Sequence, residues 1–235
     1  MKKTFLFLSV MLLGLLTFVS CSDDDNKNDP SSVVGTWKYS SDAGTMFYRF
    51  FSNGDFVMVN IAPTTDEGNS VVGGSYTVSG ANLTLVAGGQ SKSATFIRNG
   101  NTLKINSDGT TLTFDRVSDS DIASYISEFK TVNRSLLLGV WKSVDDESTN
   151  YVYFKDDGTC VSIDIQGDEV NMERGTWTLY KNILATIMGE DSETDLTCMF
   201  ITSLTSTSLT TSVAGVSGTS TRVPYSEIAR YLEAQ

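Results

Sequence analysis

Few residues in this 235-residue chain carry side chains that could do chemistry. Histidine is absent, which removes the commonest general base and the commonest zinc ligand. Paired carboxylates can hydrolyse glycosides or bind calcium, and three clusters occur, at Asp145-Asp146-Glu147, Asp156-Asp157 and Glu190-Asp191-Ser192-Glu193. These clusters lie in predicted turns, where acidic residues keep a surface soluble. With no phosphate loop and no nucleophile–base pair, the sequence favours a non-enzymatic protein without catalytic residues, metal or cofactor.

The most informative reactive residue is Cys21, because of what precedes it. Lys2 and Lys3 form a basic start, and positions 5–19 form an apolar run that is too short for a comfortable membrane span. The segment Phe18-Val19-Ser20-Cys21 resembles a bacterial lipobox. This resemblance implies that residues 1–20 are a lipoprotein signal peptide and that Cys21 becomes the lipidated first residue. The alternative is an ordinary secretory signal.

The segment 21–32 after the leader contains acidic and polar residues, including three consecutive aspartates at positions 23–25. Such a segment cannot bury surface, so we expect a disordered tether. Its acidic cluster resembles the surface-export signal of Bacteroidota lipoproteins, which implies an outer-membrane, cell-surface location. The formal net charge of −11 opposes binding to nucleic acid and to anionic membrane surfaces. The expected membrane contact is therefore the lipid on Cys21; the oligomeric state stays open.

Two further cysteines, Cys160 and Cys198, lie in the second half of the chain. Strand alternation places Val161, Ile163 and Ile165 inward, which puts Cys160 on the opposite face, whereas Cys198 shares an inward face with Phe200. A location outside the cytoplasm permits a disulfide. The expected faces differ, so free thiols are the favoured interpretation and a disulfide remains the alternative.

The elements that position these residues occur twice. Gly35-x-Trp37, an aromatic strand and Asn53-Gly54 recur 104 positions later as Gly139-x-Trp141, an aromatic strand and Asp157-Gly158. Near the ends, Arg116 and Arg222 are 106 positions apart. Two related units of roughly 100 residues follow, which we place at 33–131 and 132–235.

Short alternating segments separated by glycine turns predict antiparallel strands throughout. In the first repeat we expect strands at 36–40, 46–51, 56–61, 74–78, 82–87, 93–98, 102–106 and 110–117. Late strands of the second repeat are expected near 206–212 and 217–223. Apolar residues at helical spacing predict a helix over 119–130 and another over 226–233.

The tryptophan near the start of each repeat and the arginine near its end resemble the lipocalin (calycin) pattern of Bacteroidota lipoproteins. That resemblance implies an all-β protein of two tandem, small, antiparallel up-and-down barrels, each followed by a short helix. It also implies barrel-closing pairs, Trp37 with Arg116 and Trp141 with Arg222, held by cation–π contacts. A pair of immunoglobulin-like sandwiches is the alternative fold.

A lipocalin-like barrel implies a small apolar ligand, and six aromatic or apolar residues are candidates to face it: Tyr48, Phe50, Tyr76, Val152, Phe154 and Trp177. The alternative is a structural or accessory surface module that binds glycan or protein and has no barrel cavity. Four aromatic residues fall on the face opposite the expected core, where they either pack or stack on sugars: Phe47, Phe51, Tyr151 and Tyr153.

Overall fold

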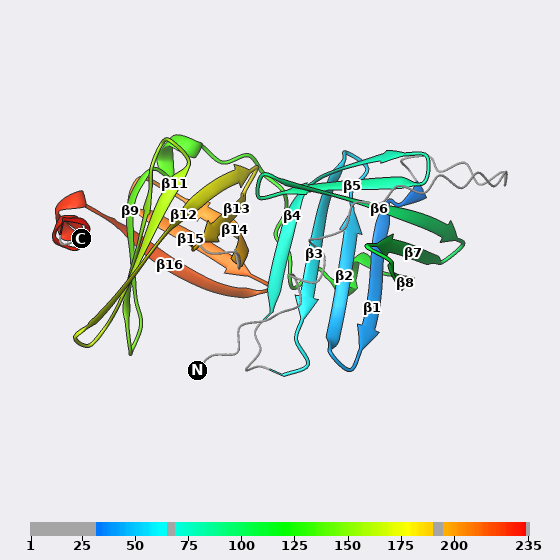
Figure 1. Ribbon diagram of the computed structural model, residues 1–235, viewed down its shortest axis with the longest axis horizontal. Helices are drawn as coiled ribbons and strands as arrows, with labels where there is room; N and C mark the ends of the chain where they lie inside the picture. The colour runs from blue at the N-terminus through cyan, green and yellow to red at the C-terminus, as the bar shows by residue number, and fades with distance from the viewer. Residues whose placement is uncertain (1–31, 65–68, 190–194, 234–235) are drawn as a thin grey trace. The chain divides into compact units, whose positions relative to one another are not determined.

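The computed structural model describes residues 32–64, 69–189 and 195–233. The predictions for the signal peptide, Cys21, the tether and the carboxylates of 190–194 lie outside these ranges. The described residues form an all-β protein (Figure 1). Among them, no helix has both the length and the apolar composition needed to cross a bilayer.

Contacts between Cα atoms divide the chain into two compact units. Within the described residues, the first contains 32–64, Asn69, Gly74–Val86 and Gln90–Ala123, and the second contains Ser70–Gly73, Ala87–Gly89, 124–189 and 195–233. We predicted a boundary after residue 131. Residues 124–131 belong instead to the second unit, because they pack on its strands, as described below.

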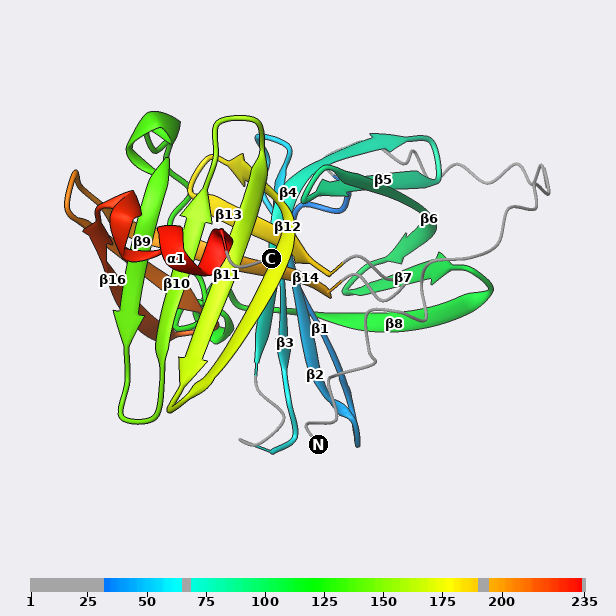
Figure 2. The same cartoon turned by 60° about the vertical axis from the view of Figure 1, so that its left-hand side comes forward.

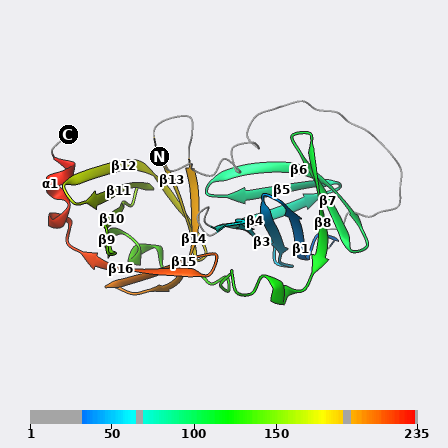
Figure 3. The same ribbon diagram turned by 90° about the horizontal axis from the view of Figure 1, so that it is seen from below.

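The second repeat forms a closed, eight-stranded antiparallel barrel. Each strand pairs with the next along the chain, and β16 pairs with β9 to close the ring (Figure 3). Trp141 and Arg222 are Cα partners at this closure. The strands are β9 (Gly139–Val144), β10 (Thr149–Phe154), β11 (Thr159–Gln166), β12 (Glu169–Tyr180), β13 (Ile183–Met188), β14 (Asp195–Leu204), β15 (Ser208–Val213) and β16 (Val216–Val223).

The first repeat contributes eight further strands with the same order of pairing. They run β4-β3-β2-β1-β8-β7-β6-β5, and β4 also pairs with β5. Trp37 of β1 and Arg116 of β8 are again Cα partners. The strands are β1 (Gly35–Ser41), β2 (Gly44–Phe50), β3 (Asp55–Ile61), β4 (Ser70–Ser79), β5 (Asn82–Ala87), β6 (Gln90–Asn99), β7 (Thr102–Ser107) and β8 (Thr110–Val117).

The turns explain why these strands could be located from sequence. Gly54 and Gly158, at equivalent places between the second and third strands of each repeat, have φ of 85° and 84°. Side chains are strained at such angles and glycine is not. Each hairpin therefore reverses where the sequence carries Asn-Gly or Asp-Gly.

The predicted helix over 119–130 is wrong. A 3-10 turn, η4 (Asp119–Asp121), is capped by Ser118, and an irregular chain follows it. The apolar residues of this segment have different destinations. Ile122 is fully buried, whereas Phe129 packs on Tyr180 and Phe200 of the second unit. The apolar residues that suggested one helix therefore pack at two separate places, and no helix is needed to bury them.

The end of the second repeat is helical but shorter than predicted. A 3-10 turn, η6 (Tyr225–Glu227), leads into α1 (Ala229–Leu232). These elements lie over the outer face of β9, β10 and β11 (Figure 2). Ile228 is fully buried there, together with Val161 and Ile163.

This cover changes the assignment of Val161, Ile163 and Ile165, which we predicted to point inward. They lie on the outside of the barrel, beneath Ile228, Tyr231 and Leu232. The interior cluster is built from the alternate residues, including Trp141, Phe154, Cys160 and Trp177. The interior side of β11 carries Cys160, Ser162 and Asp164, whereas its apolar side lies beneath the covering elements, so alternation separated the two faces correctly but assigned the apolar one to the interior.

Candidate functional site

The two tryptophan–arginine pairs lie at equivalent places in the repeats. The guanidinium carbon is 5.4 Å from the ring centre in the Arg116–Trp37 pair and 4.4 Å in the Arg222–Trp141 pair. Both indole rings are buried. Each indole N–H donates a 2.7 Å hydrogen bond to the carbonyl four residues earlier, that of Val33 or Leu137. The structure therefore brings together the residues that we expected to meet.

The two arginines nevertheless have different partners. Arg222 is half-buried and donates hydrogen bonds to the carbonyls of Leu136, Leu138 and Ser206. Three charge-assisted bonds and the indole face fix its position. In contrast, Arg116 is exposed, and within the described residues its guanidinium makes no hydrogen bond.

Arg98 replaces Arg116 at part of this site. Its guanidinium donates to the carbonyls of Ser32 (2.8 Å) and Gly100 (3.2 Å), and it lies 5.7 Å from the Trp37 ring centre. By the repeat offsets, these two carbonyls correspond to those of Leu136 and Ser206, which Arg222 occupies in the second unit. Leu204 stands where Arg98 would be in the second repeat, so the first unit uses an additional arginine.

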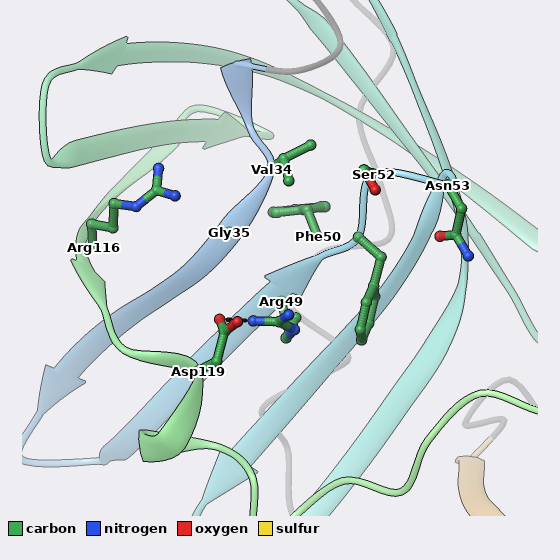
Figure 4. A pocket seen from close by; sticks show the side chains of 9 residues that line it. Val34, Gly35, Arg49, Phe50, Ser52, Asn53, Arg116 and Asp119 are labelled. Carbon is green, nitrogen blue, oxygen red and sulfur yellow. Dashed lines mark ion pairs between the residues drawn. The ribbon is translucent and has the colours of Figure 1, made fainter.

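A pocket of about 350 Å³ opens beside Arg116 in the first unit (Figure 4). Arg49 forms an ion pair with Asp119 within it, and both also contact the Thr36 hydroxyl, at 2.9 Å and 2.6 Å. Partial burial lowers the pKa of Arg49 from its usual value. The lining is Val34, Gly35, Arg49, Phe50, Phe51, Ser52, Asn53, Arg116 and Asp119.

The six candidate ligand-facing residues lie on the interior sides of their strands, where they pack on other side chains. Tyr48, Phe50 and Tyr76 are buried; the Tyr48 and Phe50 rings stack at 5.5 Å, and the Phe50 and Tyr76 rings meet edge-on at 5.0 Å. In the second unit, Phe154 meets Trp177 edge-on at 5.4 Å, and Val152 packs against the same cluster. These residues fill space around the tryptophans.

The described carboxylates stabilise turns. Asp145 accepts the backbone N–H groups of Glu147 and Ser148, which lowers its pKa, and Asp157 is held in the same way by Thr159. Asp156 pairs with Arg134. Over the described ranges, no group of three acidic or cysteine side chains is placed to hold a metal ion.

The two described cysteines are buried free thiols on different faces of the second barrel. Cys160 lies in the interior, 3.6 Å from the sulfur of Met188. Cys198 lies on the opposite face to Ile201, an interior residue. The faces are reversed relative to our prediction, because the interior of β11 is the Cys160 side. Burial raises the pKa of each thiol to about 11.

Two of the four outward aromatics are buried. Phe47 and Tyr151 lie at equivalent positions, and Tyr151 packs beneath Ile228. Tyr153 is half-buried and meets Tyr225, which is 48% exposed, edge-on at 5.5 Å. In the first repeat, the positions of Tyr153 and Tyr225 are occupied by the Arg49–Asp119 ion pair.

Sequence reasoning missed Arg98, Arg49 and Asp119. A signal existed for Arg98, because it shares an inward face with Phe96, as Arg116 does with Phe114. For Arg49 and Asp119 the signal lies in the repeat comparison, where tyrosines stand at both equivalent positions.

Comparisons with known proteins add no family assignment. No family model matches the chain, and no curated protein matches it. Among solved structures, a protein of unknown function of the DUF3598 family from Nostoc punctiforme is 12% identical with a TM-score of 0.24, over 83% of this chain and 97% of that one. The β subunit of DNA polymerase III from Pseudomonas aeruginosa is 7% identical with a TM-score of 0.20, over 87% of this chain and 62% of that one. Scores this low carry no functional argument, so the fold rests on the strand pairings.

Proposed function

We propose that this chain is a lipid-anchored, non-enzymatic protein of the cell envelope that binds a glycan or a protein at its surface. The observation that carries the proposal is the packing of Tyr48, Phe50, Tyr76, Phe154 and Trp177 against other interior side chains. Rings packed on one another leave no room for a ligand at these places. The exposed Tyr225 beside Tyr153 supports a surface role, since aromatic rings stack on sugars and on partner side chains.

The proposed architecture is a pair of tandem lipocalin-like barrels. The first eight strands pair in the same cyclic order as the closed second barrel. Tryptophan and arginine from the first and last strands meet in both units. These two features support the family resemblance, and an immunoglobulin-like sandwich requires neither of them.

A second candidate function is binding of a small apolar ligand in the first barrel. Three residues on the interior side of their strands are only half-buried, namely Tyr39, Met46 and Leu112. They share the alternation of Trp37, Tyr48 and Phe114 but lie farther along the barrel. An apolar chain could therefore contact them without displacing the aromatic cluster.

A titration with lauric acid, followed by tryptophan emission, separates the two candidates. Under the leading proposal, emission shows no saturable change. Saturable binding that Met46→Glu weakens, and that Ile97→Glu on the exposed outer face leaves unchanged, would transfer the assignment to the apolar-ligand candidate.

The anchor is tested by Cys21→Ala. The lipobox resemblance predicts that this variant is released from the membrane fraction or accumulates with its leader attached, whereas Cys160→Ala should fractionate like the wild type. Fractionation and mass unchanged by Cys21→Ala would remove the lipoprotein proposal.

A further inference from the structure

The pocket beside Arg116 contains a charged group whose counterpart in the other repeat is fully used. The Arg222 guanidinium donates hydrogen bonds to three backbone carbonyls. In the first unit, Arg98 donates to two of the equivalent carbonyls. This exchange leaves the donors of Arg116 available at the pocket wall. Contacts that close the strand order therefore do not account for the guanidinium of Arg116.

The net charge of the residues that line the pocket favours a ligand with one negatively charged group. Arg49 and Asp119 neutralise each other through their ion pair, so Arg116 leaves the lining with one net positive charge. The planar guanidinium fork matches a carboxylate, which it can bind through two parallel N–H···O bonds. A Cβ at position 35 would lie 2.8 Å from Nη2 of Arg116, and a Cβ at position 139 would lie 2.5 Å from Nη1 of Arg222, so glycine lets the guanidinium pack against the first strand in both repeats.

The remaining walls are apolar and aromatic. Val34, Phe50 and Phe51 contribute to the lining, and the Arg49 guanidinium lies 4.8 Å from the centre of the Phe51 ring. A volume of about 350 Å³ falls at the lower end of the range for small-molecule sites. A ligand with one carboxylate and a ring-sized body fits both the charge and the walls.

We propose that this pocket is a binding site for a carboxylate carried on a ring-shaped ligand, with Arg116 as its anion anchor. The ring can be that of an aromatic acid or that of an acidic sugar, since both present a carboxylate and a flat face. At the equivalent place in the described part of the second repeat, Arg222 is engaged and Tyr153 and Tyr225 replace Arg49 and Asp119. The site lies in the first unit and is separate from the apolar-ligand candidate in the barrel interior.

The test is an NMR titration of the ¹⁵N-labelled chain without its leader, at constant ionic strength. Sodium benzoate represents the aromatic acids and sodium glucuronate the acidic sugars, while benzamide and glucose are their uncharged controls. We expect saturable shifts at Arg116, Gly35 and Ser52 with at least one acid and none with the uncharged controls. The acid that binds more tightly identifies the ligand class.

Arg116→Gln should weaken binding at least tenfold, and Arg116→Lys should weaken it less, because the charge remains but the fork is lost. The matched control is Arg174→Gln, which removes an exposed arginine of the second unit and should leave binding unchanged. Amide shifts of β5, β6 and β7, which do not line the pocket, that stay in place show that the first unit is intact, and Arg116→Lys carries the test if the glutamine variant unfolds. Absence of saturable shifts with both acids, or equal affinity in wild type and the Arg116 variants, overturns the proposal.

Discussion

At the scale of single residues, the duplicated arginines show how one position acquires two roles. Arg222 satisfies three carbonyls and covers Trp141, whereas Arg116 lies 1.0 Å farther from its tryptophan and shares that ring with Arg98. Closure of the barrel needs one engaged guanidinium at this place. When a neighbouring arginine supplies it, the original arginine is available for other contacts.

This difference predicts unequal stability costs. Arg222→Ala should lower the free energy of unfolding of the second unit by about 2–4 kcal/mol, since three carbonyls lose their hydrogen-bond donor and Trp141 loses its stacked cation. Arg116→Ala should cost the first unit less than about 1 kcal/mol, because the residue is exposed. Denaturant unfolding followed for each unit measures both, and equal costs would contradict the division of roles.

Double-mutant cycles extend the comparison. Trp37→Ala and Trp141→Ala should each cost about 3–5 kcal/mol, as large aromatic deletions from cores do. The coupling energy should be larger for Trp141 with Arg222 than for Trp37 with Arg116, because the first contact is closer and more buried. Coupling energies of the same size in both pairs would show that Arg98 has not replaced Arg116 as the main cation on the Trp37 ring.

Tyr48 predicts a dependence of stability on alkaline pH. Burial raises its pKa from 10.0 to about 12, so ionisation is easier in the unfolded chain than in the folded one. Its contribution is fully present below pH 10 and is lost as the pH rises from 10 to 12, by about 3 kcal/mol in total. Urea unfolding at pH 9–12 should show a shallower decline in Tyr48→Phe than in the wild type. The control is Tyr225→Phe, at a half-exposed ring, which should follow the wild type.

At the scale of elements, each repeat buries apolar side chains on the outward faces of its strands. Ile228, followed by α1, covers Val161 and Ile163, and the equivalent residues of the first repeat, Ile122, Val57 and Val59, are all fully buried. A short covering element at the end of each repeat thus accompanies a strand whose outward side chains are apolar and buried.

Ile228→Ala and Ile122→Ala should therefore destabilise their own units by about 2–4 kcal/mol, the usual range for a buried isoleucine. Ile97→Ala, at a side chain that is 63% exposed, should change stability by less than about 0.5 kcal/mol. Thermal or urea unfolding measures all three. Small effects at Ile122 and Ile228 would mean that the covering elements are dispensable.

The same elements show which features the sequence could predict. Strand positions followed from Gly54, Gly158 and the other turn residues, because turn geometry is local. The meeting of Trp37 with Arg116 followed from the repeat. The interior face of β11 did not, since its apolar side lies outward beneath the covering elements and its interior side carries Cys160, Ser162 and Asp164. The inward face that Arg98 shares with Phe96 was a signal for its burial, but its partner at Ser32 is 66 positions away, and no local pattern reveals that contact.

At the scale of the whole molecule, a buried amide binds the segment before residue 132 to the second unit. Asn182 is fully buried. Its Nδ2 group donates to the carbonyls of Glu128 (3.1 Å) and Ile201 (3.2 Å), and its Oδ1 atom accepts the backbone N–H of Lys130 (3.1 Å). Phe129 between these partners lies 6.0 Å from the ring of Phe200, which is buried.

A fragment beginning at residue 124 should consequently be more stable than one beginning at residue 132. The shorter fragment leaves Asn182 without two of its partners, each worth about 1–3 kcal/mol when a buried polar group is stranded, and it uncovers Phe200. We expect a difference of about 3–6 kcal/mol in the free energy of unfolding between residues 124–235 and 132–235.

For the first unit, residues 33–123 should unfold at the same denaturant concentration as residues 33–131, because positions 124–131 belong to the other unit. Asn182→Ala should reduce the difference in the free energy of unfolding between residues 124–235 and residues 132–235. The substitution removes the side chain that is hydrogen-bonded to residues 128 and 130. Equal stability of the 124–235 and 132–235 fragments would place the border at the end of the sequence repeat instead.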